Sequence, residues 1–279
     1  MTYRSIFLHL DDSESGQHTV ACAVATAKAF DAELAGTYLV PRPPITPFTS
    51  AMLPDLVVRS RLADSGQAQD QAEARLRAAA TQHGLASAPF AAPAGEAFEQ
   101  AVLRARHADL AILGQPQAGA AEAEFTSRLA HAVLLDSGRP VILVPYIGCN
   151  ATAGGVALVA WKETREAARA VADALPFLKK ARRVVVVMVT EPNADDGAVA
   201  SSASGVVHYL AHHGVKAEMR REVADDIDAA NLLLSRASDL GADLLVMGGY
   251  SRARIAQRVF GGVTRTILET MTVPVLMSH

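Results

Sequence analysis

The chain has 279 residues, close to twice the commonest domain size, so its length predicts two domains rather than one. Half of the residues are apolar, 20% are charged and the net charge is -3, which is typical of globular proteins and excludes disordered chains and basic nucleic-acid-binding proteins. The longest apolar run, at 184–189, is too short to span a bilayer. We therefore expect a protein that binds neither nucleic acid nor membrane.

The N-terminal segment SIFLHLDDSESGQHTVACAVATAKAF, at 5–30, reads as a short strand, a polar turn and an alanine-rich helix. The chain becomes acidic after the strand, so we expect no secretory signal. His9 lies in the strand, where a buried, hydrogen-bonded histidine is expected rather than a catalytic one. Cys22 in the helix and Cys149 in a later glycine-rich junction have no CxxC partner, which indicates no disulfide framework and a reducing, cytoplasmic compartment.

The rest of the first half contains one irregular stretch and two clear strands. PRPPITPFTSAMLPD, at 41–55, reads as an extended loop because proline cannot continue a strand or helix. ADLAILG at 108–114 and RPVILVP at 139–145 read as strands, and YIGCNATAGG at 146–155 reads as a linker.

The second half repeats the first. ADLLVMG at 242–248 and VPVLMSH at 273–279 match the two strands above without a gap, so that Asp109 corresponds to Asp243 and Pro140 to Pro274. The starts of the two copies, SIFLHL and VALVAW, are offset by about 151 residues, while these landmarks are offset by about 134. The first copy therefore carries about 17 extra residues, which we place in the proline-rich stretch.

Each copy predicts five strands that alternate with helices. In the second copy the strands are expected near 156–161, 183–190, 215–220, 243–248 and 273–277. Their continuous apolar runs are typical of a parallel sheet covered on both faces. The predicted fold class is α/β, with two tandem doubly wound domains, each a five-stranded, mainly parallel sheet flanked by helices. Such sheets bind ligands beyond the carboxyl ends of their strands, so the turns after the first and fourth strands are the places to look for a site.

The turn after the fourth strand of the second copy, GGYSRARIAQRVFGGVTRTIL at 248–268, is a candidate phosphate site. Its small residues allow the backbone to approach a ligand, and amides at the start of the following helix can bind an anion. Arginines at 252, 254 and 258 add positive charge. The alternative is an ordinary strand-to-helix turn with solvated arginines, because loose glycine spacing is common in α/β proteins.

Other polar clusters favour structural roles. His208 and His212 lie four residues apart, as metal ligands on one helix face can, but no carboxylate or cysteine completes a set, so they and His213 read as a solvated helix end. Asp228 and the two aspartates near it precede an apolar helix and most simply cap it. The sequence has no P-loop, hydrolase elbow or dinucleotide fingerprint, so neither a metal site nor catalytic residues are predicted.

The repeat, the strand-DxS-helix opening and the glycine-rich turn together resemble the universal stress protein family, specifically its tandem two-domain members. The resemblance covers nearly the whole chain, twice. It implies domains at 1–147 and 154–279 that pair through their last strands, so that one chain forms its own pseudo-dimer. It leaves open whether two chains form a further homodimer.

Nucleotide-binding members of this family carry Gly, two residues, Gly, nine residues, Gly and then Ser or Thr. The second copy matches this motif at Gly248 and Gly261, whereas Ser251 replaces a glycine. Gly262 replaces the hydroxyl residue, and a hydroxyl is available at Thr264. The resemblance thus implies a partly retained phosphate-binding loop made of Gly248, Gly249, Ser251, Arg252, Arg254, Gly261, Gly262, Val263 and Thr264.

The family also places an aspartate after the first strand, where it contacts the adenine. Asp11 stands there in the first copy, but Lys162 reverses the charge in the second. The late turn of the first copy keeps one motif glycine, Gly114, and has Glu124 where the second copy has Arg258, a charge that disfavours phosphate. The first domain is therefore expected to carry a degenerate motif, with Asp11 as the equivalent of the base-end candidate Lys162.

The resemblance predicts a stress-response protein that binds an adenine nucleotide or another phosphate-bearing ligand in its second domain. ATP, with Mg²⁺ accompanying the nucleotide, is the first candidate, and the protein would act through ligand-dependent interactions with an unknown protein partner. One alternative is a ligand-free interaction module with degenerate sites. Another is a weak ATPase or self-phosphorylating protein, against which the incomplete motif counts; an enzymatic activity is not predicted.

Overall fold

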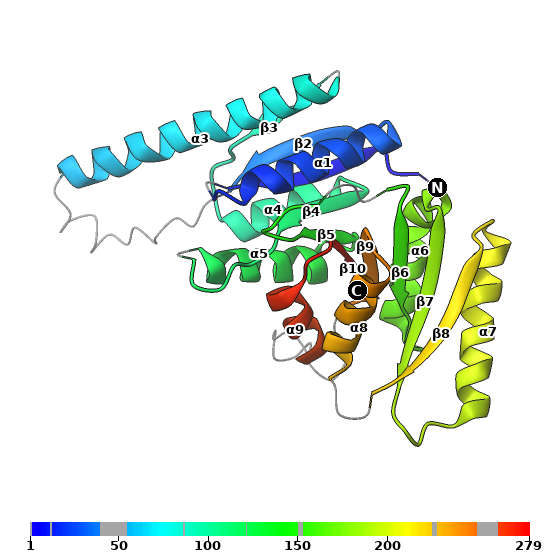
Figure 1. Cartoon of the computed structure of the whole chain (residues 1–279). Coiled ribbons are helices and arrows are strands. Elements are labelled where there is room, and N and C mark those ends of the chain that lie inside the picture. The colour runs from blue at the N-terminus through cyan, green and yellow to red at the C-terminus, as the bar shows by residue number, and fades with distance from the viewer. Residues whose placement is uncertain are drawn as a thin grey trace.

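A computed structural model of the chain contains one ten-stranded, mostly parallel sheet with helices on both faces (Figure 1). The structure describes residues 2–11, 13–39, 55–85, 87–120, 122–149, 153–224, 228–249 and 262–279, with the side chains of 55–65 left out. In this part of the chain no helix combines the length and apolar character needed to cross a bilayer.

The elements of the two halves follow the predicted alternation. The first half contains β1 (Ser5–Leu10), α1 (Gly16–Phe30), β2 (Glu33–Tyr38), α3 (Asp55–His83), β3 (Phe90–Ala91), α4 (Ala97–Arg106), β4 (Leu110–Gly114), α5 (Ala123–Asp136) and β5 (Val141–Val144). The second half contains β6 (Val156–Ala160), α6 (Arg165–Lys180), β7 (Arg183–Thr190), α7 (Asp196–His212), β8 (Ala217–Val223), α8 (Ala229–Asp239), β9 (Leu244–Gly248), α9 (Gly262–Thr270) and β10 (Val275–Ser278).

The two halves join through their last strands, as the resemblance implied. The strand order is β3-β2-β1-β4-β5-β10-β9-β6-β7-β8, in which the pairs within each half are parallel. β5 and β10 pair antiparallel, with Ile142 opposite Leu276. The predicted fold class is therefore confirmed, and the two five-stranded sheets form one continuous sheet.

The aspartate of the repeated ADL motif makes the same backbone hydrogen bonds in both halves. The Asp109 amide donates to Ser5 O at 2.8 Å, and the Asp243 amide donates to Val156 O at 2.8 Å. In return, each aspartate accepts from the amide that starts the first strand of its half: Asp109 Oδ2 accepts from Ser5 N at 3.1 Å and Asp243 Oδ2 from Val156 N at 2.7 Å. The aspartate in both ADL motifs thus holds the first strand in register with the fourth.

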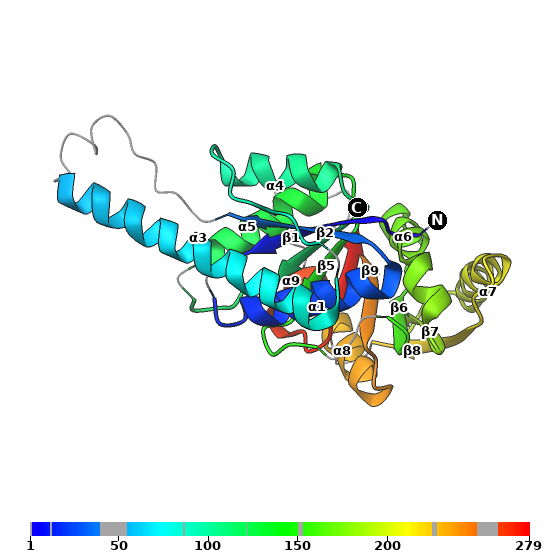
Figure 2. The same cartoon turned by 90° about the horizontal axis from the view of Figure 1, so that it is seen from above.

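Two hydrophobic cores lie on opposite faces of the sheet, because successive side chains of a strand point to opposite faces. One core lies beneath α1, α3, α6 and α7, and the other beneath α4, α5, α8 and α9. Figure 2 shows helices above and below the sheet. Each core contains residues of both halves, so the halves share their interiors.

The extra residues of the first copy are distributed differently from the prediction. α3 has 29 residues, whereas its counterpart α7 has 17, so part of the extra length extends this helix. The reason is local, since alanine, glutamine, glutamate and arginine dominate its C-terminal part and favour helix over loop. In Figures 1 and 2, α3 reaches beyond the sheet. Most of the proline-rich stretch, residues 41–54, lies outside the described residues.

Candidate functional site

The structure brings three of the predicted site residues to one edge of the sheet. β6 and β9 are neighbours, with Ala160 opposite Met247, so their carboxyl ends lie side by side. Lys162 follows β6 and is exposed, Gly248 ends β9, and Gly249 comes next. This edge is where a doubly wound sheet binds ligands.

The two glycines at this edge differ in how closely other atoms approach them. A Cβ atom at Gly248 would lie 2.6 Å from Ala167 N and 2.7 Å from the carbonyl carbon of Glu166, so the start of α6 fills the space that a side chain would need. A Cβ atom at Gly249 would lie 2.9 Å from Leu134 Cδ2, in α5 of the other half. Close backbone approach therefore accounts for Gly248 without a ligand, whereas at Gly249 the contact is with the end of a flexible leucine side chain, which can move.

The remaining loop residues divide into two groups. Gly262 begins α9 and is exposed, and no atom of the described residues lies within 4 Å of a Cβ placed there. Val263 packs against the core under α9, and Thr264 is 5% exposed, so these two side chains support the helix. The loop positions Ser251, Arg252, Arg254 and Gly261 lie outside the described residues, and their role stays a prediction.

A polar network that the sequence did not indicate connects α6, β9 and the last residue of the chain. Arg165 Nε donates to Glu166 Oε1 at 2.6 Å, and Arg165 Nη2 donates to His279 Nε2 at 3.2 Å. His279 Nδ1 donates to Gly249 O at 3.2 Å. The sequence signal is weak, because Arg165 and Glu166 follow Lys162 closely but their partner is more than a hundred residues away. The network places a guanidinium beside the candidate edge.

Glu166 is the buried acid of this network, with its side chain 6% exposed. Burial alone would raise its pKa, but hydrogen bonds from Arg165 and Thr164 and the Arg165 charge together lower the pKa of the carboxyl below its usual value. Thr164 caps α6 and accepts from Ala167 N at 3.3 Å. The carboxylate is also favoured by its place in the first turn of the helix, where the dipole is positive.

Asp11, the first-domain equivalent of Lys162, makes local hydrogen bonds. Asp11 Oδ1 accepts from Ser13 N at 3.0 Å and from Ser13 Oγ at 2.6 Å. A Cβ atom at Gly16 would lie 2.5 Å from the same oxygen, so the carboxylate lies against the first turn of α1. In the late turn of this half, Glu124 is exposed in the first turn of α5. These contacts give Asp11 a role in shaping its own turn.

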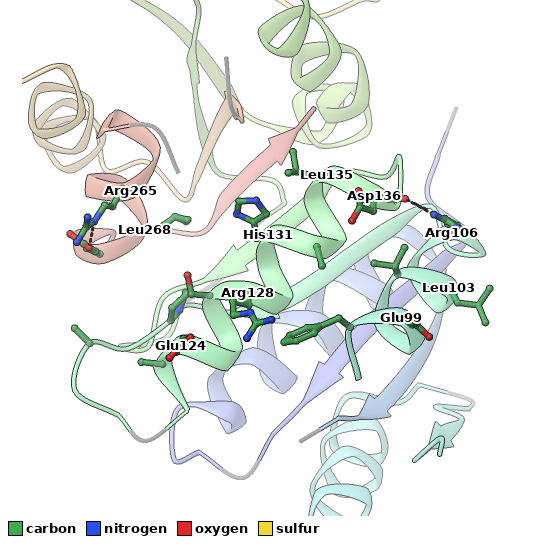
Figure 3. A pocket seen from close by; sticks show the side chains of 18 residues that line it. Glu99, Leu103, Arg106, Glu124, Arg128, His131, Leu135, Asp136, Arg265 and Leu268 are labelled. Atoms are coloured by element: carbon green, nitrogen blue, oxygen red, sulfur yellow. Dashed lines mark hydrogen bonds and ion pairs between the residues drawn. The ribbon is translucent and has the colours of Figure 1, made fainter. Parts of the chain in front are cut away.

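A cavity of about 1080 Å³ lies elsewhere, between α4, α5 and α9. Figure 3 shows Glu124, Arg128 and His131 coming from α5, and Arg265 and Leu268 from α9. Charged side chains of both signs line this cavity, and Arg265 forms an ion pair with Glu269 of the same helix at 2.8 Å. Among the described residues of the candidate edge, Lys162, Gly248 and Gly249 do not line this cavity.

The other polar clusters have the expected geometry. His9 is 2% exposed and donates from Nε2 to Leu39 O at 3.0 Å, which confirms a buried, hydrogen-bonded histidine. His208 and His212 are exposed, with their Nε2 atoms 2.9 Å apart. Asp228 caps α8 through the amide two residues later, at 3.3 Å, as predicted. Among the residues that the structure describes, no group of three or more His, Cys, Asp or Glu side chains could hold a metal ion.

Comparisons with known proteins agree with this architecture. The sequence profile of the universal stress protein family matches residues 156–279. The fold is similar to that of a universal stress protein from Archaeoglobus fulgidus, with a TM-score of 0.69, 14% identity, and coverage of 98% of this chain and 97% of that one. It is also similar to a protein of unknown function from Pseudomonas aeruginosa, with a TM-score of 0.57, 17% identity, and coverage of 99% and 92%. No curated protein matches the chain.

The profile accounts for the second half, and the first half repeats its strands, its strand order and its register-setting hydrogen bonds. Residues 156–279 therefore match the universal stress protein family, and the first half repeats the fold of this second half in tandem.

Proposed function

We propose that the second domain of this stress protein binds a phosphate-bearing ligand, with an adenine nucleotide as the first candidate. Binding would control contacts with a protein partner. The observation that carries the proposal is the pair of cations at the edge of β6 and β9, where exposed Lys162 and the Arg165 guanidinium, ion-paired with Glu166, lie beside the first turn of α6. Cations and a helix N-terminus at the switch point of an α/β sheet favour an anion.

Arg165 is the residue through which a phosphate would be recognised. Its side chain is 51% exposed, so a ligand can reach the guanidinium. Glu166 accepts from Nε, whereas Nη2 donates to the His279 ring nitrogen Nε2. A phosphate carries negative charge and can accept from a guanidinium with two oxygens at once, whereas the imidazole offers one nitrogen. A phosphate would therefore replace His279 as the acceptor and release the C-terminal residue.

Lys162, at the end of the site where a nucleobase would lie, is expected to discriminate only weakly among nucleobases. A lysine ammonium has three donors and no acceptor, so Lys162 cannot accept from the amino group of adenine, as an aspartate would. We therefore expect ATP and GTP to bind with similar affinity. Mg²⁺ would enter with the nucleotide, since it is usually held by phosphates with few protein ligands.

Tryptophan fluorescence provides a direct test. Trp161 is the one tryptophan of the chain, precedes Lys162, and donates from Nε1 to Ser202 Oγ at 3.0 Å. Titration with ATP, with and without Mg²⁺, is expected to change its emission to saturation and to raise the melting temperature. A ligand present at about 100 times its Kd stabilises the native state by about 2.7 kcal/mol.

Three variants assign the binding to the proposed residues. Arg165→Gln is expected to abolish both signals, because it removes the charged donor. Glu166→Gln is expected to lower the Kd about tenfold, a difference of about 1.4 kcal/mol, because it removes a competing negative charge. Asp11→Ala serves as the control and should leave ATP binding unchanged. A loss of binding in Asp11→Ala would place the site in the first domain, and no response to millimolar ATP would exclude nucleotide binding.

One observation favours the alternative of a ligand-free interaction module. Glu166 and His279 already accept hydrogen bonds from Arg165, and the space beside Gly248 is filled by α6. If this network is the permanent structure of the edge, Trp161 emission and the melting temperature will not respond to ATP, GTP or inorganic phosphate. Arg165→Gln would then lower the melting temperature without affecting any ligand response.

A further inference from the structure

The segment that leaves the first half folds back onto α1. His18 Nδ1 donates to Tyr146 O at 2.8 Å, and a Cβ atom at Gly148 would lie 3.2 Å from the His18 ring. Cys22 lies one helical turn after His18, on the same face of α1. Cys149 directly follows Gly148. The backbone contacts at Tyr146 and Gly148 thus hold Cys149 against the part of α1 that carries Cys22.

The two thiols are close enough for each to be the largest influence on the other's pKa. Cys22 is 4% exposed and belongs to the core under α1, and Cys149 packs against the same core. Both are free thiols. Their separation in the sequence, without a CxxC motif, indicated no pairing, but the fold makes them neighbours.

The environments of the thiols differ in a way that assigns them different chemical roles. Cys149 is half-buried and lines a cavity of about 400 Å³ together with His18, so a small oxidant can reach it. The interaction with Cys22 lowers the pKa of the Cys149 thiol, although burial and the nearby Asp243 charge oppose this. The same interaction and burial raise the pKa of Cys22. Cys149 is therefore the more reactive thiol, and Cys22 is protected from solvent.

We propose that Cys22 and Cys149 form a peroxide-sensitive dithiol, in which Cys149 is oxidised first and Cys22 then closes an intramolecular disulfide. This inference is independent of the ligand site on the second domain. It gives a stress protein a chemical response to oxidant that ties the linker between the halves to α1.

The reaction consumes one molecule of hydrogen peroxide. The Cys149 thiolate attacks one peroxide oxygen, the O–O bond breaks, and Cys149 becomes a sulfenic acid while the leaving hydroxide takes up a proton to form water. The Cys22 sulfur then attacks the Cys149 sulfur, so that the S–S bond forms and the S–O bond breaks, and the hydroxide leaves with the Cys22 proton as a second water. The two thiols together lose two electrons and two protons, which reduce the peroxide.

Mass spectrometry of the full-length protein tests the proposal. The reduced protein is treated with one equivalent of hydrogen peroxide, and the remaining thiols are alkylated. We expect a mass loss of about 2 Da, no alkylation and a peptide that joins the segments around Cys22 and Cys149, all reversed by dithiothreitol. The bond closes a long loop, so oxidation should raise the melting temperature by about 5 to 10 °C. Two alkylated thiols after peroxide, or disulfides between chains on a non-reducing gel, would overturn the proposal.

Single variants test the order of the two steps. In Cys22→Ser, the sulfenic acid at Cys149 has no resolving thiol, so dimedone should label Cys149. In Cys149→Ser, Cys22 should stay reduced at the same dose of peroxide, because it is buried. Labelling of Cys22 instead of Cys149 would contradict the assigned order. The wild-type mass measurement needs no variant, so the proposal stays testable if either substitution impairs folding.

Discussion

His9 is a buried titratable group whose protonation is linked to folding. Burial lowers its pKa below the usual value of 6.5, although the Asp11 charge and the hydrogen bond to Leu39 O favour the protonated form. The unfolded chain therefore binds a proton at a higher pH than the folded chain does, and folding stability rises with pH in that window. The imidazole is neutral at pH 7, with Nε2 as the donor to Leu39 O.

We expect the free energy of unfolding to fall as the pH drops below 6.5 towards the lower pKa of folded His9. The limiting slope for one proton is about 1.4 kcal/mol per pH unit. His9→Gln retains a donor and does not titrate, so the free energy of unfolding of this variant should depend less on pH over this range. Urea denaturation at a series of pH values measures both proteins, and parallel curves for the two would show that His9 is not the linked group.

Equivalent residues of the two halves have diverged to different degrees. Asp109 and Asp243 keep the same backbone hydrogen bonds, because both halves need the same strand register. Gln115 and Gly249 also occupy matching places at the end of the fourth strand, but their contacts differ. Gln115 Nε2 donates to Leu268 O of the other half at 2.8 Å, whereas Gly249 packs on Leu134. Residues that set the sheet are thus preserved, and residues at the strand ends are free to change.

At the scale of elements, the contact between β9 and α6 distinguishes packing from ligand binding. Gly248→Ala would place a methyl group against the backbone of α6, which cannot move without shifting the helix. We expect it to lower the free energy of unfolding by about 1 to 3 kcal/mol, as overpacking does. Gly262→Ala is the matched control, since in the described part of the chain its Cβ would meet no atom within 4 Å. Its effect on stability should stay within about 0.5 kcal/mol.

Urea denaturation of the two glycine variants, each with and without ATP, separates the two roles. A ligand cradle at the start of α9 predicts that Gly262→Ala weakens ATP binding while leaving stability unchanged. A stability loss of similar size in both variants would show that close packing at β9 is not what requires Gly248.

The sequence was most informative where local pattern determines structure. The strand near 183–190 was predicted at its observed bounds. A continuous apolar run of this length is typical of a strand that helices cover on both faces of the sheet. The length of α3 was missed, because the adjacent prolines gave a stronger signal than the helix-favouring residues after 55. The contacts of Arg165 with His279, and of Cys22 with Cys149, join residues distant in the sequence. Topology alone brings such residues together, so no local pattern indicates them.

At the scale of the whole molecule, an aromatic cluster on one face of the sheet packs residues of the two halves against each other. Tyr3 and Phe30 belong to the first half and Phe177 to the second, with ring centroids 4.8 to 5.4 Å apart. The N-terminus accordingly lies beside α6 in Figures 1 and 2. Tyr3 also donates a hydrogen bond from its hydroxyl to the Asp173 carbonyl of α6. Together with the β5–β10 pairing, these contacts join residues of the two halves in one hydrophobic core.

Because both cores cross the junction, we expect the chain to unfold in one cooperative transition rather than domain by domain. Phe177 is 1% exposed, and Phe177→Ala should lower the free energy of unfolding by about 3 to 5 kcal/mol while moving the entire transition. Tyr209→Ala, at a site 38% exposed on α7, is the control and should have an effect of less than about 1 kcal/mol. Differential scanning calorimetry checks this through the ratio of calorimetric to van't Hoff enthalpy, which is near unity for one transition. If Phe177→Ala shifted one of two resolved peaks, the halves would be independent folding units, and the shared cores would not couple them.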